Sequence, residues 1–263
     1  MRGMRITACA VSHPGTCRER NEDAFYLNGA VPYFDKPSMY RGSTAKPIVA
    51  GVFDGMGGIS AGDRASYLAT EAARAAQERY TDGDVRELLL DICRDANAAV
   101  CEDMQATGQR MGATASMLCF ANDRAVVCNV GDSPIFLFRS SRLTELSHAH
   151  TERETFVEVY GEEAIPPGKK FKLTQHIGIF PEEMEIEPHV TVKKLRIGDR
   201  FLICSDGLTD MVSRAEIAAV LCLGLSASRT AGRLIRRALE AGGKDNVTVV
   251  CADVKHPLSL FEW

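Results

Sequence analysis

Hydrophobic residues are concentrated in short runs rich in Val, Ile and Phe, and Gly or Asp bounds many of these runs. Runs of this length and composition are typical of β-strands, because amphipathic helices need longer segments with a wider repeat. The predicted strands are residues 6–12, 23–28, 47–53, 113–120, 124–130, 134–139, 189–195, 200–205 and 246–254. We therefore expect a fold that contains many strands.

Four other segments repeat apolar residues at helical spacing. The predicted helices are residues 61–76, 84–105, 213–222 and 227–241. Ser60 and Asp63 resemble a capping box at the start of the first of them. The helices come in adjacent pairs and most strands follow one another closely, which favours antiparallel sheets faced by helices over repeated β-α-β crossovers.

The chain shows no sign of a domain boundary. No Pro/Ser-rich linker or low-complexity run divides it, so we expect residues 1–263 to form a single domain. Residues 147–188 have mixed periodicity and include "IPPGKK" and "IFPEEMEIEP". We interpret this segment as a surface excursion of the same domain.

Composition narrows the class of protein. With 45% hydrophobic and 25% charged residues, the chain has the balance of a soluble globular protein. A formal charge of −4 and a pI near 5.9 do not favour general binding to nucleic acid or to an anionic membrane. No apolar stretch approaches about 18 residues, and the first residues lack the apolar core of a signal peptide. We expect a cytoplasmic protein with no membrane insertion.

The nine cysteines form no Cys-x-x-Cys pair, and several lie inside apolar runs. A reduced cysteine in such a run behaves as a small core residue. The spacing therefore favours buried free thiols over a disulfide framework or a zinc site. Cys17 differs from the others, since it stands beside Arg18 in a polar loop.

Carboxylates stand at the ends of several predicted strands. Strand-like runs lead into Asp54, Asp132 and Asp206, while Asp23 and Asp245 stand at the starts of two others. A single Asp-Gly is ordinary turn chemistry, but sheet packing brings strand ends together. Two unit charges about 4 Å apart cost on the order of 4 kcal/mol at an effective dielectric near 20, so clustered acids need cations or protons.

Oxygen-rich sites of this kind suit hard cations such as Mg²⁺ and Mn²⁺. Two such ions can hold a hydroxide between them and polarise a phosphoryl oxygen, which is the chemistry of a hydrolase. Acids that gather but pair with Lys and Arg would argue against this interpretation.

The stretch "VFDGMGG" (residues 52–58) also resembles the glycine turn of a dinucleotide-binding site. The third glycine position is occupied by Ser60, and roughly the next 45 residues offer no second strand to carry a ribose-binding acid. The histidines stand in no Ser/His/Asp arrangement that the sequence supports. Neither alternative accounts for the acids at the strand ends.

The ordered set "GTCRERNEDAF", "VFDGMGG", "MGATAS", "VGDSPIFLFR", "GDRFLICSDGLTDMVS" and "GGKDNVTVV" resembles the protein phosphatase 2C family of metal-dependent serine/threonine phosphatases, in its compact bacterial form. The resemblance runs from about residue 15 to residue 254. It implies an α+β fold, a four-layer αββα sandwich with two central antiparallel sheets. It also implies a binuclear Mn²⁺/Mg²⁺ site in a cleft at one end.

The resemblance assigns metal ligands by motif position. Asp54 corresponds to the carboxylate that bridges both ions, and Gly55 to a ligand through its backbone carbonyl. The remaining protein ligands implied are Asp23, Asp206 and Asp245, some of them acting through water.

Two further residues correspond to the family's catalytic machinery. Arg18 is similar to its phosphate-binding arginine, and Glu22 to the acid that orients metal-bound water. Met56 replaces a histidine proposed as general acid in many eukaryotic members, and Pro134 replaces the arginine of a "Gly-Asp-Ser-Arg" motif. The segment "TGQRMGAT" lacks the carboxylate that binds a third metal in many members, which argues against a third ion here.

We therefore expect a monomeric cytoplasmic phosphatase that uses two Mn²⁺ or Mg²⁺ ions and attacks the phosphorus directly with a bridging hydroxide. Its partners would be phosphoserine and phosphothreonine proteins made by a Ser/Thr kinase, and residues 147–188 would form a flap beside the cleft. Two alternatives stay open, a catalytically weak binding module with the same fold and a small-molecule phosphatase. Manganese titration, and a comparison of phosphopeptide with sugar phosphate, discriminate between them.

Overall fold

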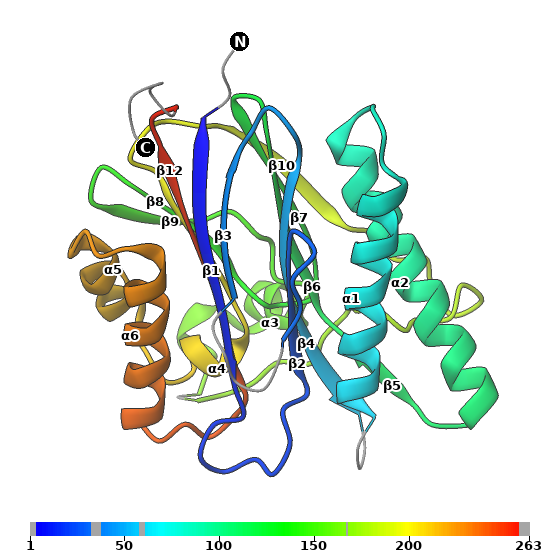
Figure 1. Ribbon diagram of the computed structural model, residues 1–263. Coiled ribbons are helices and arrows are strands. Elements are labelled where there is room, and N and C mark those ends of the chain that lie inside the picture. The colour runs from blue at the N-terminus through cyan, green and yellow to red at the C-terminus, as the bar shows by residue number, and fades with distance from the viewer. Residues whose placement is uncertain (1–3, 33–37, 58–60, 167, 258–263) are drawn as a thin grey trace.

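The computed structural model of the protein describes residues 4–32, 38–57, 61–166 and 168–257. Its described strands form two antiparallel sheets that pack face to face (Figure 1). The first sheet has the strand order β3 (Ser38–Ser43), β1 (Arg5–His13), β12 (Val247–Lys255), β11 (Arg200–Cys204), β8 (Ile135–Arg139), β9 (Arg142–Glu145). The second has the order β10 (His189–Lys194), β7 (Arg124–Val130), β6 (Ala115–Ala121), β4 (Ile48–Gly57), β2 (Asp23–Leu27), and β5 (Met111–Ala113) pairs with the end of β4.

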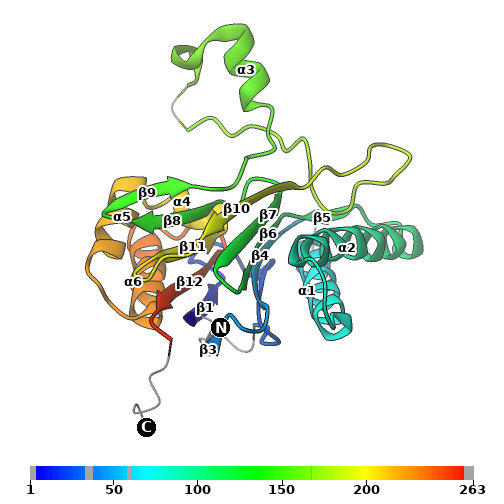
Figure 2. The ribbon, with the colours of Figure 1, turned by 90° about the horizontal axis from the view of Figure 1, so that it is seen from above.

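Helices cover the outer face of each sheet, as Figure 2 shows. The elements on the second sheet are α1 (Gly62–Arg79) and α2 (Val85–Thr107), and those on the first sheet are α5 (Arg214–Cys222), α6 (Ala227–Glu240) and the short α4 (Asp206–Thr209). The layers therefore run helix, sheet, sheet, helix. This arrangement confirms the predicted αββα sandwich.

Apolar side chains fill the three spaces between the four layers. Between the sheets the rings of Phe120 and Phe201 meet edge to face, with centroids 5.2 Å apart. Under α1 the buried residues are small, for example Ala65 and Ala69, which lets the helix lie close to the sheet. Because a fully buried large apolar side chain contributes about 1.5–3 kcal/mol, these layers position the strand ends firmly.

The predicted strands all occur, with ends displaced by a few residues. The prediction for residues 113–120 was wrong in one respect, because the strand is interrupted at Thr114. There the backbone N–H donates to the carbonyl oxygen of Asp54 at 2.9 Å. Strands β3 and β9 were not predicted, because they are partly exposed edge strands whose polar sequences, "SMYRGS" and "RLTE", contain no apolar run.

The predicted helices are present as well. Helix α1 begins at Gly62 with Ala61 in the N-cap position and no side-chain capping bond, and Ser60 lies outside the described residues. Asp84 caps α2 by accepting a hydrogen bond from the backbone N–H of Arg86 at 2.9 Å. Helix α4 was not predicted, because its four residues are too short for a periodic pattern.

Residues 147–188, called the flap below, connect β9 of the first sheet to β10 of the second. The flap carries α3 (Arg153–Tyr160) and the 3-10 turn η1 (Glu162–Ala164), and α3 stands away from the sheets in Figure 2. The exposed fractions of Val159 and Tyr160 are 65% and 66%, so α3 contributes little to the central core. Neither α3 nor η1 was predicted, because the segment has mixed periodicity.

The nine cysteines all lie within the described residues and are free thiols, as predicted. Cys17 and Cys222 are exposed and the other seven are buried.

Among the helices that the structure describes, none combines the length and the apolar character needed to cross a membrane.

Candidate active site

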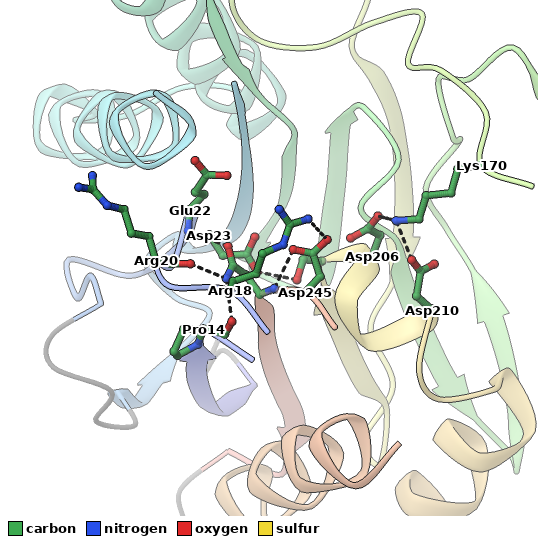
Figure 3. A network of polar contacts seen from close by, with 11 residues as sticks. Pro14, Arg18, Arg20, Glu22, Asp23, Lys170, Asp206, Asp210 and Asp245 are labelled. Atoms are coloured by element: carbon green, nitrogen blue, oxygen red, sulfur yellow. Dashed lines mark hydrogen bonds and ion pairs between the residues drawn. The ribbon is translucent and has the colours of Figure 1, made fainter. Parts of the chain in front are cut away.

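The pairing of β2 with β4 places two of the predicted ligands side by side. Asp23 and Asp54 are directly opposite in this antiparallel register. In the other sheet, Asp206 follows β11 and Asp245 precedes β12, and these two strands are also paired. Because the sheets stack, the four acids meet at one end of the sandwich, and Figure 3 shows Asp23, Asp206 and Asp245 from close by.

A cleft of about 320 Å³ opens at this end. The predicted site residues that line it are Arg18, Glu22, Asp54, Gly55, Asp206 and Asp245. Asp23 is different, because it lies beneath the cleft with an exposed fraction of 6%. The hydroxyl of Ser205 donates a hydrogen bond of 2.7 Å to its Oδ2. The structure thus brings the predicted residues together and places Asp23 in the floor of the site.

Burial and mutual repulsion make these acids difficult to ionise without cations. Desolvation, followed by repulsion from Asp23 and Asp206, raises the pKa of Asp54 well above its ordinary value. Desolvation also raises the pKa of Asp23 to about 7, although hydrogen bonds from Ser205 and Thr248 oppose the shift. Desolvation and repulsion from Asp206 raise the pKa of Asp132 to about 6.

Two of the predicted ligands have a cationic partner in the structure. The guanidinium of Arg18 donates to Oδ2 of Asp245 at 2.8 Å, and the ammonium of Lys170 donates to Oδ2 of Asp206 at 3.0 Å (Figure 3). Both cations are more than half exposed, with side-chain exposed fractions of 53% and 64%. Ion pairs of such exposed side chains contribute only about 0–1 kcal/mol, so another ion can readily replace either partner.

The charge balance of the cleft decides between a metal site and a closed salt-bridge network. Among the described lining residues, five carry a carboxylate (Glu22, Asp54, Asp132, Asp206, Asp245) and two are cations (Arg18, Lys170). Buried Asp23 adds a further acid below them. Two single positive charges leave the carboxylates in excess, and an all-oxygen donor set with excess negative charge fits hard divalent cations.

The side chains alone do not form a closed cage. Within the described residues, no group of three or more His, Cys, Asp or Glu side chains is placed to hold one metal ion by itself. Ligation would therefore also draw on backbone oxygen and on water. Gly55 lines the cleft, and its carbonyl oxygen is the backbone ligand that the sequence analysis expected.

Asn246 fastens the loop that carries Arg18 and Glu22. Its side-chain amide donates to the carbonyl oxygens of Pro14 and Arg20, at 2.9 Å and 2.8 Å, and its Oδ1 accepts from the N–H of Glu22 at 2.8 Å. All three bonds of one side chain therefore hold the loop against the start of β12. Loss of Asn246 would remove these three bonds, while others remain, such as the one from the N–H of Thr16 to the carbonyl of Gly243 at 2.8 Å.

Thr114 holds the backbone of Asp54 in the same way. Its hydroxyl accepts a hydrogen bond of 3.0 Å from the N–H of Asp54 and lies 2.8 Å from the hydroxyl of Ser133. Thr114, in the gap between β5 and β6, thus holds the backbone of Asp54 through both its N–H and its hydroxyl. Local backbone pairing alone would not reveal this role.

Gly207 allows α4 to approach the start of β12, and its substitution gives a test of packing beside the site. A Cβ atom at this position would lie 1.9 Å from the carbonyl oxygen of Asn246. We expect Gly207→Ala to lower the free energy of unfolding by about 1–3 kcal/mol, measured by urea denaturation in EDTA. Gly232→Ala in α6 is the control, since its Cβ meets nothing within 4 Å, and it should stabilise by about 0.5–1 kcal/mol. Equal stability of the two variants would contradict this packing argument.

Sequence analysis missed several residues of the cleft. Lys170, Phe171 and Leu173 of the flap line it, and Asp210 forms a second ion pair with Lys170 at 2.7 Å. The available signal was the basic run "GKKFKL" inside the predicted flap. That run does not show which lysine points towards the acids.

Comparison with known proteins agrees with the family resemblance of the sequence motifs. A family model described as "Protein phosphatase 2C" matches residues 34–241. The chain is 35% identical over 231 residues to the serine/threonine protein phosphatase PstP of Mycobacterium tuberculosis, which covers 86% of this chain but 43% of that protein. It is 30% identical over 250 residues to the serine/threonine phosphatase stp of Listeria innocua, covering 91% of this chain and 92% of that protein.

Among solved structures, the catalytic domain of PstP in complex with 2 manganese ions matches with a TM-score of 0.77 and 30% identity. The match covers 96% of this chain and 99% of that chain. The present chain thus spans less than half the length of full PstP but nearly all of its solved catalytic domain.

Proposed function

Because this chain belongs to the protein phosphatase 2C family, we propose that it is a metal-dependent phosphatase that hydrolyses phosphoserine and phosphothreonine in proteins. The observation that carries the proposal is the excess of carboxylates over cations in the cleft. The similarity to a phosphatase domain solved with manganese supports the same assignment.

Five residues would hold two divalent cations. They are Asp54, which would serve both ions, Gly55, which would bind through its carbonyl, and Asp23, Asp206 and Asp245. The ions would supply Lewis-acid stabilisation of phosphoryl charge and a more acidic water. Asp23 and Asp54 come from paired positions on neighbouring strands, so the rigid second sheet sets their separation. This rigidity limits the reorganisation that catalysis would need.

Arg18 and Glu22 would act on the substrate and on water. Arg18 is half exposed at the mouth of the cleft, where its planar guanidinium can form two hydrogen bonds to one phosphate group. Its present partner Asp245 is weakly held because the pair is exposed, so a dianionic phosphate can replace it. Glu22 lines the cleft beside Asp54 and can orient a water molecule by accepting its hydrogen bond.

The flap would shape the choice of substrate. Phe171 and Leu173 give the acidic cleft an apolar wall, which the polypeptide around a phosphorylated side chain can contact more extensively than an isolated sugar phosphate can. Proteins phosphorylated by a Ser/Thr kinase are therefore the proposed substrates. The cytoplasmic location and the monomeric state stay predictions.

The direct test is phosphatase activity on a phosphothreonine peptide and on a sugar phosphate, with and without Mn²⁺. We expect activity that requires Mn²⁺, favours the peptide and falls by roughly tenfold or more in Asp206→Asn, because one proposed ligand is weakened. Asp123→Asn, a change of an exposed acid outside the cleft, is the matched control and should retain activity. Activity indifferent to both Mn²⁺ and Asp206→Asn would contradict the proposal.

A further inference from the structure

Lys170 connects the flap to the acidic cleft. Its ammonium group donates to Oδ2 of Asp206 at 3.0 Å and contacts Oδ2 of Asp210 at 2.7 Å, as Figure 3 shows. Asp206 begins α4 and Asp210 is the residue that follows this helix. One flap side chain therefore bridges the two ends of the short helix that carries a proposed metal ligand.

In the flap tip (residues 153–166 and 168–171), ring contacts join α3 to residues 169–171. The ring of Phe156 lies 4.9 Å from that of Tyr160 and 5.3 Å from that of Phe171, measured between centroids. The ammonium of Lys169 lies over the rings of Phe156 and Phe171, at 5.1 Å and 5.3 Å. Lys170 stands between Lys169 and Phe171 in the sequence, so its position is coupled to that of the whole tip.

The base of the flap is attached by backbone pairing. Thr151 pairs with Leu173, and Ile177 pairs with Ala113 at the end of β5. Farther out, α3 stands clear of the sheets in Figure 2. Within the described residues, the ion pairs of Lys170 link the flap tip to Asp206 in the cleft and to Asp210 beside it.

A divalent cation and Lys170 would compete for Asp206. This step rests on the proposed function, since it takes Asp206 as a metal ligand. At equal distance a doubly charged ion attracts a carboxylate twice as strongly as an ammonium group does. Lys170 is also held on a flexible stem with an exposed fraction of 64%, so its pairing is weak and easily exchanged.

We infer that Lys170 is a positioning residue that ties the flap tip to Asp206 and Asp210, and that a divalent cation binding at Asp206 competes with this tie. Metal loading then loosens the flap tip beside the cleft. Conversely, the tie weakens metal binding, because the ion must displace Lys170. The two effects are reciprocal by thermodynamic linkage.

Limited proteolysis of the full chain with a Glu-specific protease measures the tie directly. The flap tip offers exposed Glu158, Glu162 and Glu163, and none of the substitutions below changes a cleavage site. Without metal, we expect Lys170→Gln to be cut about twofold to fivefold faster than wild type, which corresponds to the loss of the two exposed ion pairs of Lys170. Mn²⁺ should accelerate cleavage of wild type towards the rate of Lys170→Gln and leave that variant unchanged.

Two further variants separate the tie from a general effect of charge. Lys170→Arg keeps the positive charge and should restore slow cleavage. Lys172→Gln removes the same charge from an exposed position two residues away and should be cut like wild type. In calorimetric titrations, Mn²⁺ should bind Lys170→Gln about twofold to fivefold more tightly than it binds Lys172→Gln.

The outcomes are distinct. If wild type binds Mn²⁺ but Lys170→Gln and Lys172→Gln have equal affinities, or if Mn²⁺ does not change cleavage of wild type, the tie proposed for Lys170 is overturned while the proposed function stands. If wild type binds no Mn²⁺, both proposals are overturned. Faster cleavage of Lys170→Gln, rescue by Lys170→Arg and tighter Mn²⁺ binding support the tie.

Discussion

Asp54→Asn is expected to lower phosphatase activity by roughly 10²- to 10³-fold and to weaken Mn²⁺ binding strongly. Asp54 lies opposite Asp23 in the sheet and lines the acidic cleft, where its carboxylate would bind both ions. An amide is neutral and cannot offer two charged oxygens. Loss of metal stabilisation worth several kcal/mol corresponds to this decrease, since each 1.36 kcal/mol changes a rate tenfold.

The same variant should remain folded, which separates a catalytic role from a structural one. In EDTA at neutral pH, Asp54→Asn removes a carboxylate whose ionisation is opposed by burial and by repulsion from Asp23 and Asp206. Its free energy of unfolding should therefore equal or exceed that of wild type, measured by urea denaturation. Calorimetry with Mn²⁺ and a peptide phosphatase assay complete the measurement. Wild-type activity and Mn²⁺ affinity in a folded Asp54→Asn protein would refute the bridging role.

The metal-free protein is expected to become more stable as the pH falls from about 7.5 to about 5. Burial raises the pKa of Asp23 to about 7 from an ordinary value of 3.8, so between these values the folded state binds a proton that the unfolded state releases. The free energy of unfolding is then greatest below the unfolded pKa and falls as the pH rises towards 7. From Asp23 alone, the change between about pH 7 and pH 5 is roughly 2 kcal/mol.

Urea denaturation in EDTA at both pH values measures this effect. Asp132, with a pKa raised to about 6, adds to it, whereas His189 opposes it because burial and His148 lower the pKa of its imidazole. The decisive quantity is therefore the difference between wild type and Asp23→Asn, which lacks the titrating carboxyl. Saturating Mn²⁺ should reverse the trend, since the ions favour the charged carboxylates. Identical pH profiles of wild type and Asp23→Asn would show that Asp23 is not the source.

Most of the scaffold was predictable because its signals are local. The strands that became β6, β7, β11 and β12 are nearly continuous apolar runs, as expected for strands covered on both faces. Strand β3 escaped prediction because an edge strand pairs through its backbone and leaves half of its side chains exposed. Helix α4 escaped because four residues carry no periodicity.

The candidate site divides in the same way. Asp54 and Asp206 could be identified because each follows an apolar run within a recognisable motif, although β4 continues past Asp54 to Gly57 and Asp206 is the first residue of α4. The burial of Asp23 beneath the cleft could not be predicted, because it depends on Ser205, which is 182 residues away in the chain. Asn246 likewise reaches the carbonyl of Pro14 across 232 residues.

The sequence by itself determined which side chains carry charge at strand ends, and hence the chemistry available to the cleft, because those positions follow from short apolar runs and the turns that end them. Tertiary structure alone decided how that charge is balanced. Lys170 meets Asp206 across 36 residues and Arg18 meets Asp245 across 227. Such pairings depend on how the flap folds over the cleft and how the two sheets stack, and no local pattern encodes either distance.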